Sequence, residues 1–313
     1  MSKTSRAPTL FVREATGLVR ELGPFSVFTY TFTDIVSSGI NYFVPKFPSI
    51  HPGADPFVSI AIAAIPAILG AIAITMVLSA MPRAGGHYTI FSRTIDPSVG
   101  NLFGGIVGWV LGFACVAWFL YLSPIFLGTT FVIAGDILKW GWLVDVGITM
   151  SEELWAIFAV GFVLFVIFTL IDMLGSRWMK WSINIMFIIY MVGALVAIGL
   201  LLMNTPTTAA TAWDKAWGTG AYDQIVLEST DLNWSKAPFD WGATHGSLAT
   251  SFWAFVGFEF VAPLGSEIRE PKKSMFWGSI VATIFIAIWY LIIAGSLYRA
   301  YGMDFISRYD HVY

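Results

Sequence analysis

Long apolar stretches without charged side chains alternate with short polar segments along most of this chain. A helix needs about 20 apolar residues to cross the hydrocarbon core of a bilayer. Two apolar segments, residues 23–45 and 244–265, are interrupted near the middle. The uninterrupted stretches that suit one crossing are residues 57–81, 97–135, 154–171, 181–213 and 274–298. The pattern therefore predicts an integral membrane protein with seven helical spans.

Each interrupted segment carries one carboxylate next to residues that form helices poorly. Asp34 precedes the Ser-Ser-Gly of residues 37–39, and Glu259 follows Gly257 and Phe258. An ionisable side chain at bilayer depth is costly, and interrupted backbone is tolerated there only inside protein or beside a water-filled cavity. Two such breaks at corresponding positions of a chain indicate the binding site of a transporter.

Composition and charge placement agree with a membrane protein. The 313 residues are 57% hydrophobic and 12% charged, whereas about a quarter of the residues in soluble domains are charged. With a cytoplasmic N-terminus, eleven of the 17 Lys and Arg residues fall in inner segments and six in outer ones, which follows the positive-inside bias. We expect a multi-pass protein of the cell membrane with its N-terminus in the cytoplasm.

The first break suits an anionic group. Ser37, Ser38 and Gly39 can leave backbone N–H groups unpaired, and a half-helix that starts beyond them points its positive dipole end at the break. A substrate carboxylate held by the N–H groups of Ser38, Gly39 and Ile40 follows from this. The alternative is a notch of small residues where helices pack. Asp34 has a weaker case, because it can simply tie helices together.

The second break suits a cationic group. Gly257 and Phe258 would expose carbonyl oxygens that can accept hydrogen bonds from a substrate ammonium. Glu259 could bind a cation or take up a proton; its alternative role is a structural carboxylate bonded to neighbouring helices. Trp253 and Phe258 flank the break and could close over a substrate, although most aromatic side chains in membrane helices face lipid or other helices.

Three motifs resemble a known family. Residues 35–40 read Ile-Val-Ser-Ser-Gly-Ile, and residues 81–88 read Met-Pro-Arg-Ala-Gly-Gly-His-Tyr. Phe-Val-Gly-Phe-Glu at 255–259 is followed by Glu-Ile-Arg-Glu-Pro-Lys-Lys at 267–273. In order and spacing, these motifs cover nearly the whole chain and resemble the amino acid–polyamine–organocation (APC) superfamily of permeases.

This resemblance implies an all-α inverted-repeat transporter fold with discontinuous first and sixth helices, working by alternating access. An amino acid would bind at the unwound centres of those helices, and a carboxylate at the position of Glu259 is linked to proton sensing in some members. H⁺ is therefore a candidate coupling ion. The candidate substrate-binding residues are Ser37, Ser38, Gly39, Ile40, Trp253, Gly257 and Phe258. The candidate coupling and gating residues are Asp34, Glu259, Arg83, Gly85, Gly86 and Tyr88.

Three positions depart from the pattern of these permeases. Ser37 replaces the first Gly of the usual Gly-Ser-Gly, which narrows the backbone freedom of the first break. Asn41 stands where Phe is common and adds polarity. Tyr190 stands where some proton-coupled members carry Lys, so coupling through a lysine is not expected.

Length is the largest departure, because these permeases have about twelve spans, the first five repeated upside-down by the next five. We expect a chain truncated after about seven spans, with the missing C-terminal helices in the same or another chain. Its expected parts are a cytoplasmic segment 1–22, the first repeat 23–203, an extracellular loop 204–243, two helices of the second repeat 244–300, and an extracellular tail 301–313.

Other classes fit the chain less well. A retinal protein needs a lysine in its last span, and residues 274–298 contain none. A receptor would place its N-terminus outside, whereas a channel or a non-transporting seven-helix membrane fragment stays open as an alternative. We expect no enzyme, because the spans show no metal-ligand cluster and no nucleophile–base grouping. The expected partners are an amino acid, H⁺ and the lipid bilayer, without cofactor, metal or nucleic acid.

Overall fold

The fold is helical throughout the part of the chain that the computed structural model describes, namely residues 20–38, 40–83 and 85–313. Those ranges contain no β-strand, and one isolated bridge pairs Leu22 with Ile268. The predicted all-α class is confirmed.

Five helical stretches of the described chain are long and apolar enough to cross a membrane, judged by length and composition. Three are single helices: α3 (Pro56–Ala80), α8 (Leu154–Met173) and α9 (Ser176–Met203). A fourth joins α5 (Pro97–Val99), the π-helix η1 (Gly100–Val107) and α6 (Gly108–Leu138). The fifth joins α14 (Pro271–Met275), the π-helix η3 (Phe276–Val281) and α15 (Ala282–Tyr301). They correspond to the five uninterrupted stretches of the sequence.

The charge-free stretch 181–213 covers two helices. Helix α9 ends at Met203, and a separate helix, α10 (Pro206–Trp217), begins three residues later. Thr205 is extended because a residue that precedes proline avoids the helical region, and it caps α10. The end of α9 coincides with the expected end of the first repeat at residue 203.

The two interrupted segments differ in structure. The first forms α1 (Pro24–Ser38) and α2 (Ile40–Ile50) on either side of Gly39, which lies outside the described residues. The second forms α12 (Trp241–Gly246) and α13 (Leu248–Trp253), and then continues as turns and the 3₁₀-helix η2 (Ala262–Ser266). An α-helix was expected to resume there. Instead, i→i−3 hydrogen bonds such as Phe260 N–H to Gly257 O keep the backbone tightly wound.

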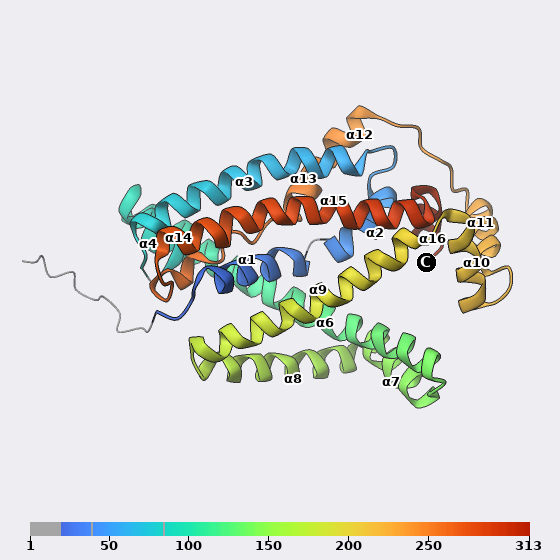
Figure 1. Ribbon diagram of the computed structural model, residues 1–313, viewed down its shortest axis with the longest axis horizontal. Coiled ribbons are helices and arrows are strands. Elements are labelled where there is room, and N and C mark those ends of the chain that lie inside the picture. Colours follow the sequence, from blue (N-terminus) through green and yellow to red (C-terminus); the bar gives the residue numbers. More distant parts are fainter. Residues whose placement is uncertain (1–19, 39, 84) are drawn as a thin grey trace, which may run out of the picture.

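The helices form two groups (Figure 1). We call α1, α3, α13 and α15 the central group, because α3 contacts α13 and α15, and α15 also contacts α1. We call α6, α7 (Gly141–Glu152) and α8 the peripheral group, because they pack mainly on each other. Helix α9 lies between the groups and contacts α1, α15 and α8.

Short helices gather at the two ends of the molecule (Figure 1). At the end predicted to face outward, α11 (Ala221–Asp231) of the outer loop packs against α16 (Met303–Val312), which also contacts α2. Arg308 of α16 donates hydrogen bonds to the Val226 carbonyl and the Ser229 hydroxyl of α11. At the end predicted to face inward, α4 (Gly86–Thr94) contacts η1 and η2.

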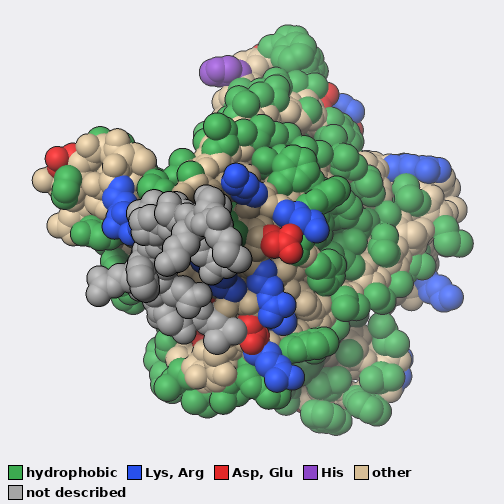
Figure 2. Space-filling model, turned by 60° about the vertical axis from the view of Figure 1, so that its left-hand side comes forward, with side chains coloured by type: hydrophobic (Ala, Val, Ile, Leu, Met, Phe, Trp, Pro, Cys, Tyr) green, Lys and Arg blue, Asp and Glu red, His purple; other side chains and the backbone are tan. Residues whose placement is uncertain are grey.

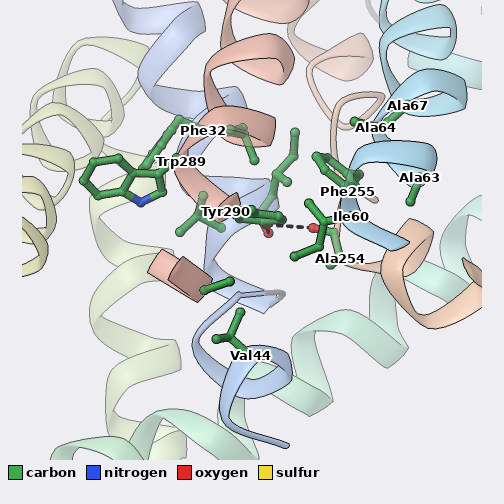
Figure 3. Close-up of a cluster of buried hydrophobic side chains, with 14 of the residues drawn as sticks. Phe32, Val44, Ile60, Ala63, Ala64, Ala67, Ala254, Phe255, Trp289 and Tyr290 are labelled. Carbon is green, nitrogen blue, oxygen red and sulfur yellow. Dashed lines mark hydrogen bonds between the residues drawn. The ribbon is translucent and has the colours of Figure 1, made fainter. Parts of the chain in front are cut away.

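The hydrophobic core of the central group lies where α1, α3, α13 and α15 meet (Figure 3). Phe32, Ile35, Phe255 and Tyr290 are each at most 1% exposed. Three alanines of α3, Ala63, Ala64 and Ala67, face this core and allow close approach of the neighbouring helices. The core therefore surrounds the ends of both interrupted helices.

Candidate functional site

The two interrupted helices meet at Gly257. Its φ of 131° lies in a region that side-chain-bearing residues rarely adopt. A Cβ atom at this position would stand 2.9 Å from Asp34 Oδ2 and 3.2 Å from the Ile35 backbone nitrogen. Both the conformation and the space therefore require glycine, and the missing side chain lets the second break touch the last turn of α1.

Two carboxylates, one from each predicted break, converge on this glycine. Glu259 Oε2 accepts a hydrogen bond from the Gly257 N–H at 3.2 Å, while Asp34 Oδ2 lies beside the glycine Cα on the α1 side. The charge of Glu259 acts on Asp34. Since two nearby carboxylates repel each other when both are ionised, the arrangement favours a proton or a cationic group between the breaks.

The phenol of Tyr290 joins the two helix ends from α15. Its hydroxyl lies 2.7 Å from the Ala254 carbonyl oxygen, just after α13, and 3.3 Å from the Ile35 carbonyl oxygen in the last turn of α1. Figure 3 shows the shorter bond as a dashed line in the buried core. Sequence reasoning missed Tyr290. The one signal was a phenol inside an apolar span, which needs a hydrogen-bond partner when buried.

The carboxylate cradle predicted at the first break lies at a helix junction. Ser37 and Ser38 end α1 and Ile40 begins α2, while Gly39 between them lies outside the described residues. The centre of the predicted cradle therefore lies outside the described residues.

The aromatic candidates of the second break occupy different sides. Trp253, 40% exposed, packs edge-to-face on Phe43 of α2, with ring centroids 5.0 Å apart. This pair joins the halves of the two interrupted helices on the side predicted to be outer. The ring of Phe258 instead packs on α3, where a Cβ at Gly70 would come within 2.6 Å of Phe258 Cζ.

The inner connection of residues 81–88 packs beside the second break. A Cβ at Gly86 would lie 3.1 Å from the Pro263 nitrogen, and one at Gly265 would lie 3.1 Å from the Arg83 carbonyl oxygen. Gly85 precedes α4 with a φ of 99°. The backbone of Tyr88 contacts η1 at Gly104, and its side chain is 46% exposed. These four candidates belong to one connection, and two of them, Arg83 and Gly86, lie against η2.

Two opposing effects act on the pKa of His87 in this connection. Burial lowers the pKa of His87, and the negative charge of Glu259 acts in the opposite direction.

The two residues before Gly23, just ahead of α1, form backbone hydrogen bonds with the chain that follows the second break. The N–H groups of Glu21 and Leu22 donate to the Glu267 carbonyl, and the Arg269 N–H donates to the Leu22 carbonyl, in each case within 3.0 Å. Lys180 of α9 lies 3.9 Å from the Glu21 carboxylate. Figure 2 looks onto this end of the molecule and shows Lys and Arg side chains interspersed with a few carboxylates.

A large cavity opens at the opposite end. Its volume is about 930 Å³, and it lies between residues 48–57, residues 233–239 and α16. Among the predicted site residues that the structure describes, none lines this cavity. Its cationic side chains already have partners, since Lys236 pairs with Asp304 and Arg308 lies over the Trp234 ring. The predicted site residues Asp34, Gly257 and Glu259 lie elsewhere, where α1 approaches the second break.

Comparison with known proteins gives one family and one curated relative. The family model described as amino acid permease matches residues 22–308. The branched-chain amino acid permease BcaP of Bacillus subtilis (strain 168) is 23% identical over 300 residues, which cover 94% of this chain and 58% of the relative. The chain therefore spans little more than half the length of that relative. No solved structure matches the chain.

Proposed function

The chain belongs to the amino acid permease family, and from this premise we propose that it carries an amino acid across the membrane by secondary-active, alternating-access transport. The observation that carries the proposal is the approach of Asp34 and Ile35, in the turns of α1 that precede the first predicted break, to Gly257 of the second break, where Glu259 accepts the Gly257 N–H. Buried carboxylates and interrupted backbone in a membrane helix mark a pathway for a charged or polar solute. The resemblance of the matched relative supports the same solute class.

The substrate lies between opposite helix ends in this proposal. Its carboxylate meets the N–H groups of Ser38, Gly39 and Ile40, which lead into α2, where a helix dipole would be positive. Its ammonium meets Gly257 and the carbonyl oxygens where α1 and α13 end, because helix C-termini carry partial negative charge. An amino acid presents both charges about one atom apart, which matches a site with both polarities.

Alternating access requires a gate at either end of the site. The outer gate of the proposal is the contact of Trp253 with Phe43, which closes over the breaks. The inner gate is the connection that carries Arg83, Gly85, Gly86 and Tyr88 and that packs against η2. Opening one contact while the other stays closed would expose the site to one side only.

Coupling and completeness are further parts of the proposal. Glu259 is the candidate for the coupling proton in this proposal, because it lies at the second break beside Gly257, which Asp34 approaches from α1. The protein is a multi-pass protein of the cell membrane with a cytoplasmic N-terminus, as the placement of its Lys and Arg residues favours. Further helices, in the same or another chain, complete the inverted second repeat. The intact mass of the protein isolated from its native membrane tests that last point.

Uptake by the complete protein in proteoliposomes tests the site. Gly257→Ala should reduce amino acid uptake at least about tenfold, because strained backbone of this kind costs about 1–3 kcal/mol and the methyl group would press on Asp34. The matched control is Gly112→Ala in α6, where an added Cβ meets nothing within 4 Å. Normal uptake by the Gly257 variant would remove the site from this position, and a wild-type protein that takes up no amino acid would end the proposed function.

A further inference from the structure

Two prolines, Pro45 and Pro48, lie inside α2, the half of the first interrupted segment that is predicted to be outer. Proline has no backbone N–H, and its ring collides with the carbonyl group four residues earlier in a helix. Pro48 therefore denies the Val44 carbonyl the hydrogen bond that residue 48 supplies in an ordinary helix. Because Val44 is only 3% exposed, a donor from another element would stabilise this part of α2.

The phenol of Tyr298 supplies that donor. Its hydroxyl donates to the Val44 carbonyl oxygen at 2.6 Å, from a position 254 residues further along the chain. Tyr298 lies in α15, is 8% exposed, and packs edge-to-face on Phe57, with ring centroids 6.0 Å apart. Through this short bond from a packed ring, α15 fixes the position of the proline-containing part of α2.

A second polar contact of this part of α2 is more exposed. Lys46 pairs with Asp310 of α16 at 2.9 Å, and the lysine side chain is 43% exposed. Solvent screens such a pair, so it contributes little to holding the helix. The buried bond from Tyr298 is therefore expected to hold α2 more firmly than the ion pair does.

We infer that Tyr298 is a positioning residue for the outer gate. Phe43, whose ring meets Trp253 in that gate, directly precedes Val44 in α2. The bond to the Val44 carbonyl thus fixes the backbone one residue from the gate contact. The inference rests on the proposed function, which makes this contact the outer gate. Loss of the phenol hydroxyl should release α2 and let the gate open more often.

A small cavity behind the gate provides a reporter of its opening. It has a volume of about 20 Å³, lies between α2, α3, α13 and α15, and is lined by Val44, Ser251 and Tyr298 among others. Ser251 is 5% exposed, so the thiol of a Ser251→Cys variant should react with a maleimide only when the cavity opens. Cys115→Ala removes the native thiol. Labelling rates of the complete protein in detergent then measure gate opening independently of transport.

The labelling rate is compared in three backgrounds. Tyr298→Phe alone should raise it about tenfold, within the range of one buried hydrogen bond. Pro48→Ala returns a backbone N–H to position 48, so in that background the same loss should change the rate less than about twofold. Pro45→Ala is the matched control, because its N–H serves the carbonyl of residue 41 and not that of Val44. The tenfold effect should persist there.

Two results would overturn the inference: an unchanged labelling rate for Tyr298→Phe alone, or equal responses in the Pro48→Ala and Pro45→Ala backgrounds. If Tyr298→Phe does not fold, Pro48→Ala should restore folding and Pro45→Ala should not. Recovery by neither substitution would contradict the role of the bond to Val44. Amino acid uptake by the unmodified protein is measured separately, so failure of the proposed function is distinguished from failure of this inference.

Discussion

The central and peripheral groups of helices are similarly apolar but differ in how much of their surface is buried within the protein. In their most apolar 18-residue windows, α14–α15 is 44% buried and α3 is 33% buried, against 11% for the stretch that contains α6 and 17% for α8. The peripheral helices thus expose most of their apolar side chains, such as Phe158, which suits contact with lipid or with further helices. Hydropathy alone does not separate the two groups.

Hydrogen bonding does separate them. In the peripheral group, hydroxyl groups bond to their own helix, as Ser123 does with the Phe119 carbonyl and Thr129 with the Ile125 carbonyl. In the central group some also bond across helices, as Ser59 of α3 does with Ser247 beside α13, although Ser296 bonds within α15. A bond within one helix leaves its neighbours free to slide, whereas a bond between helices specifies their register. The polar contacts that fix relative positions are therefore concentrated around the candidate site.

Removing a large side chain from each group should produce the largest contrast. Phe32→Ala in α1 deletes a ring that is 1% exposed and packs on Phe187 and Phe285, so a cavity should remain. We expect a loss of about 3 kcal/mol in the free energy of unfolding, measured by denaturant titration in detergent. Phe158→Ala in α8, where the ring is 74% exposed, should cost less than about 0.5 kcal/mol. Similar losses for both variants would erase the distinction between the groups.

A smaller contrast should follow from single hydroxyl groups. Thr29 Oγ1 lies 2.6 Å from Asn184 Oδ1 of α9, whereas Thr129 Oγ1 bonds within α6. Thr29→Val should lower the free energy of unfolding by about 0.6 kcal/mol, a typical value for a bond between membrane helices. Thr129→Val should leave it unchanged within error. An equal response of both threonines would show that cross-helix bonds do not distinguish the central group.

The smallest effect should appear as a pH dependence at the edge of the central group. His51, next to α2, bonds through Nε2 to Thr250 Oγ1 of α13 at 2.9 Å, and burial lowers its pKa from the ordinary value of 6.5. The imidazole of His51 therefore binds a proton more tightly in the unfolded chain than in the folded one. As a result, the free energy of unfolding falls as pH drops below about 6.5. His51→Asn should flatten this part of the curve of unfolding temperature against pH.

The control for this measurement is His245→Asn, because the His245 side chain is exposed. Its removal should leave the pH profile of the wild-type protein in place. A profile that responds to His245 and not to His51 would contradict the assignment.

The sequence predicted what depends on local composition. Five spans appeared as charge-free stretches. The irregular backbone at Gly257 was predicted from the glycine and its neighbouring carboxylate, whereas the first predicted break centres on Gly39, outside the described residues. The turns and the 3₁₀-helix that follow Trp253 were missed, because apolar composition does not change there. The role of Tyr290 was missed for another reason. Its partners are 255 and 36 residues away, and hydropathy carries no record of which phenol meets which carbonyl.

The bond between Tyr290 and Ile35 also sets an order of events during synthesis. The two residues are 255 positions apart, so at roughly 5–20 residues per second Tyr290 follows Ile35 out of the ribosome after about 13–50 s. Throughout that interval α1 lacks the hydrogen bond that the Tyr290 hydroxyl makes to the Ile35 carbonyl. A nascent chain that stalls before α15 would present an unfinished polar helix end to the insertion and degradation machinery, which makes α15 the element that marks the central group as complete.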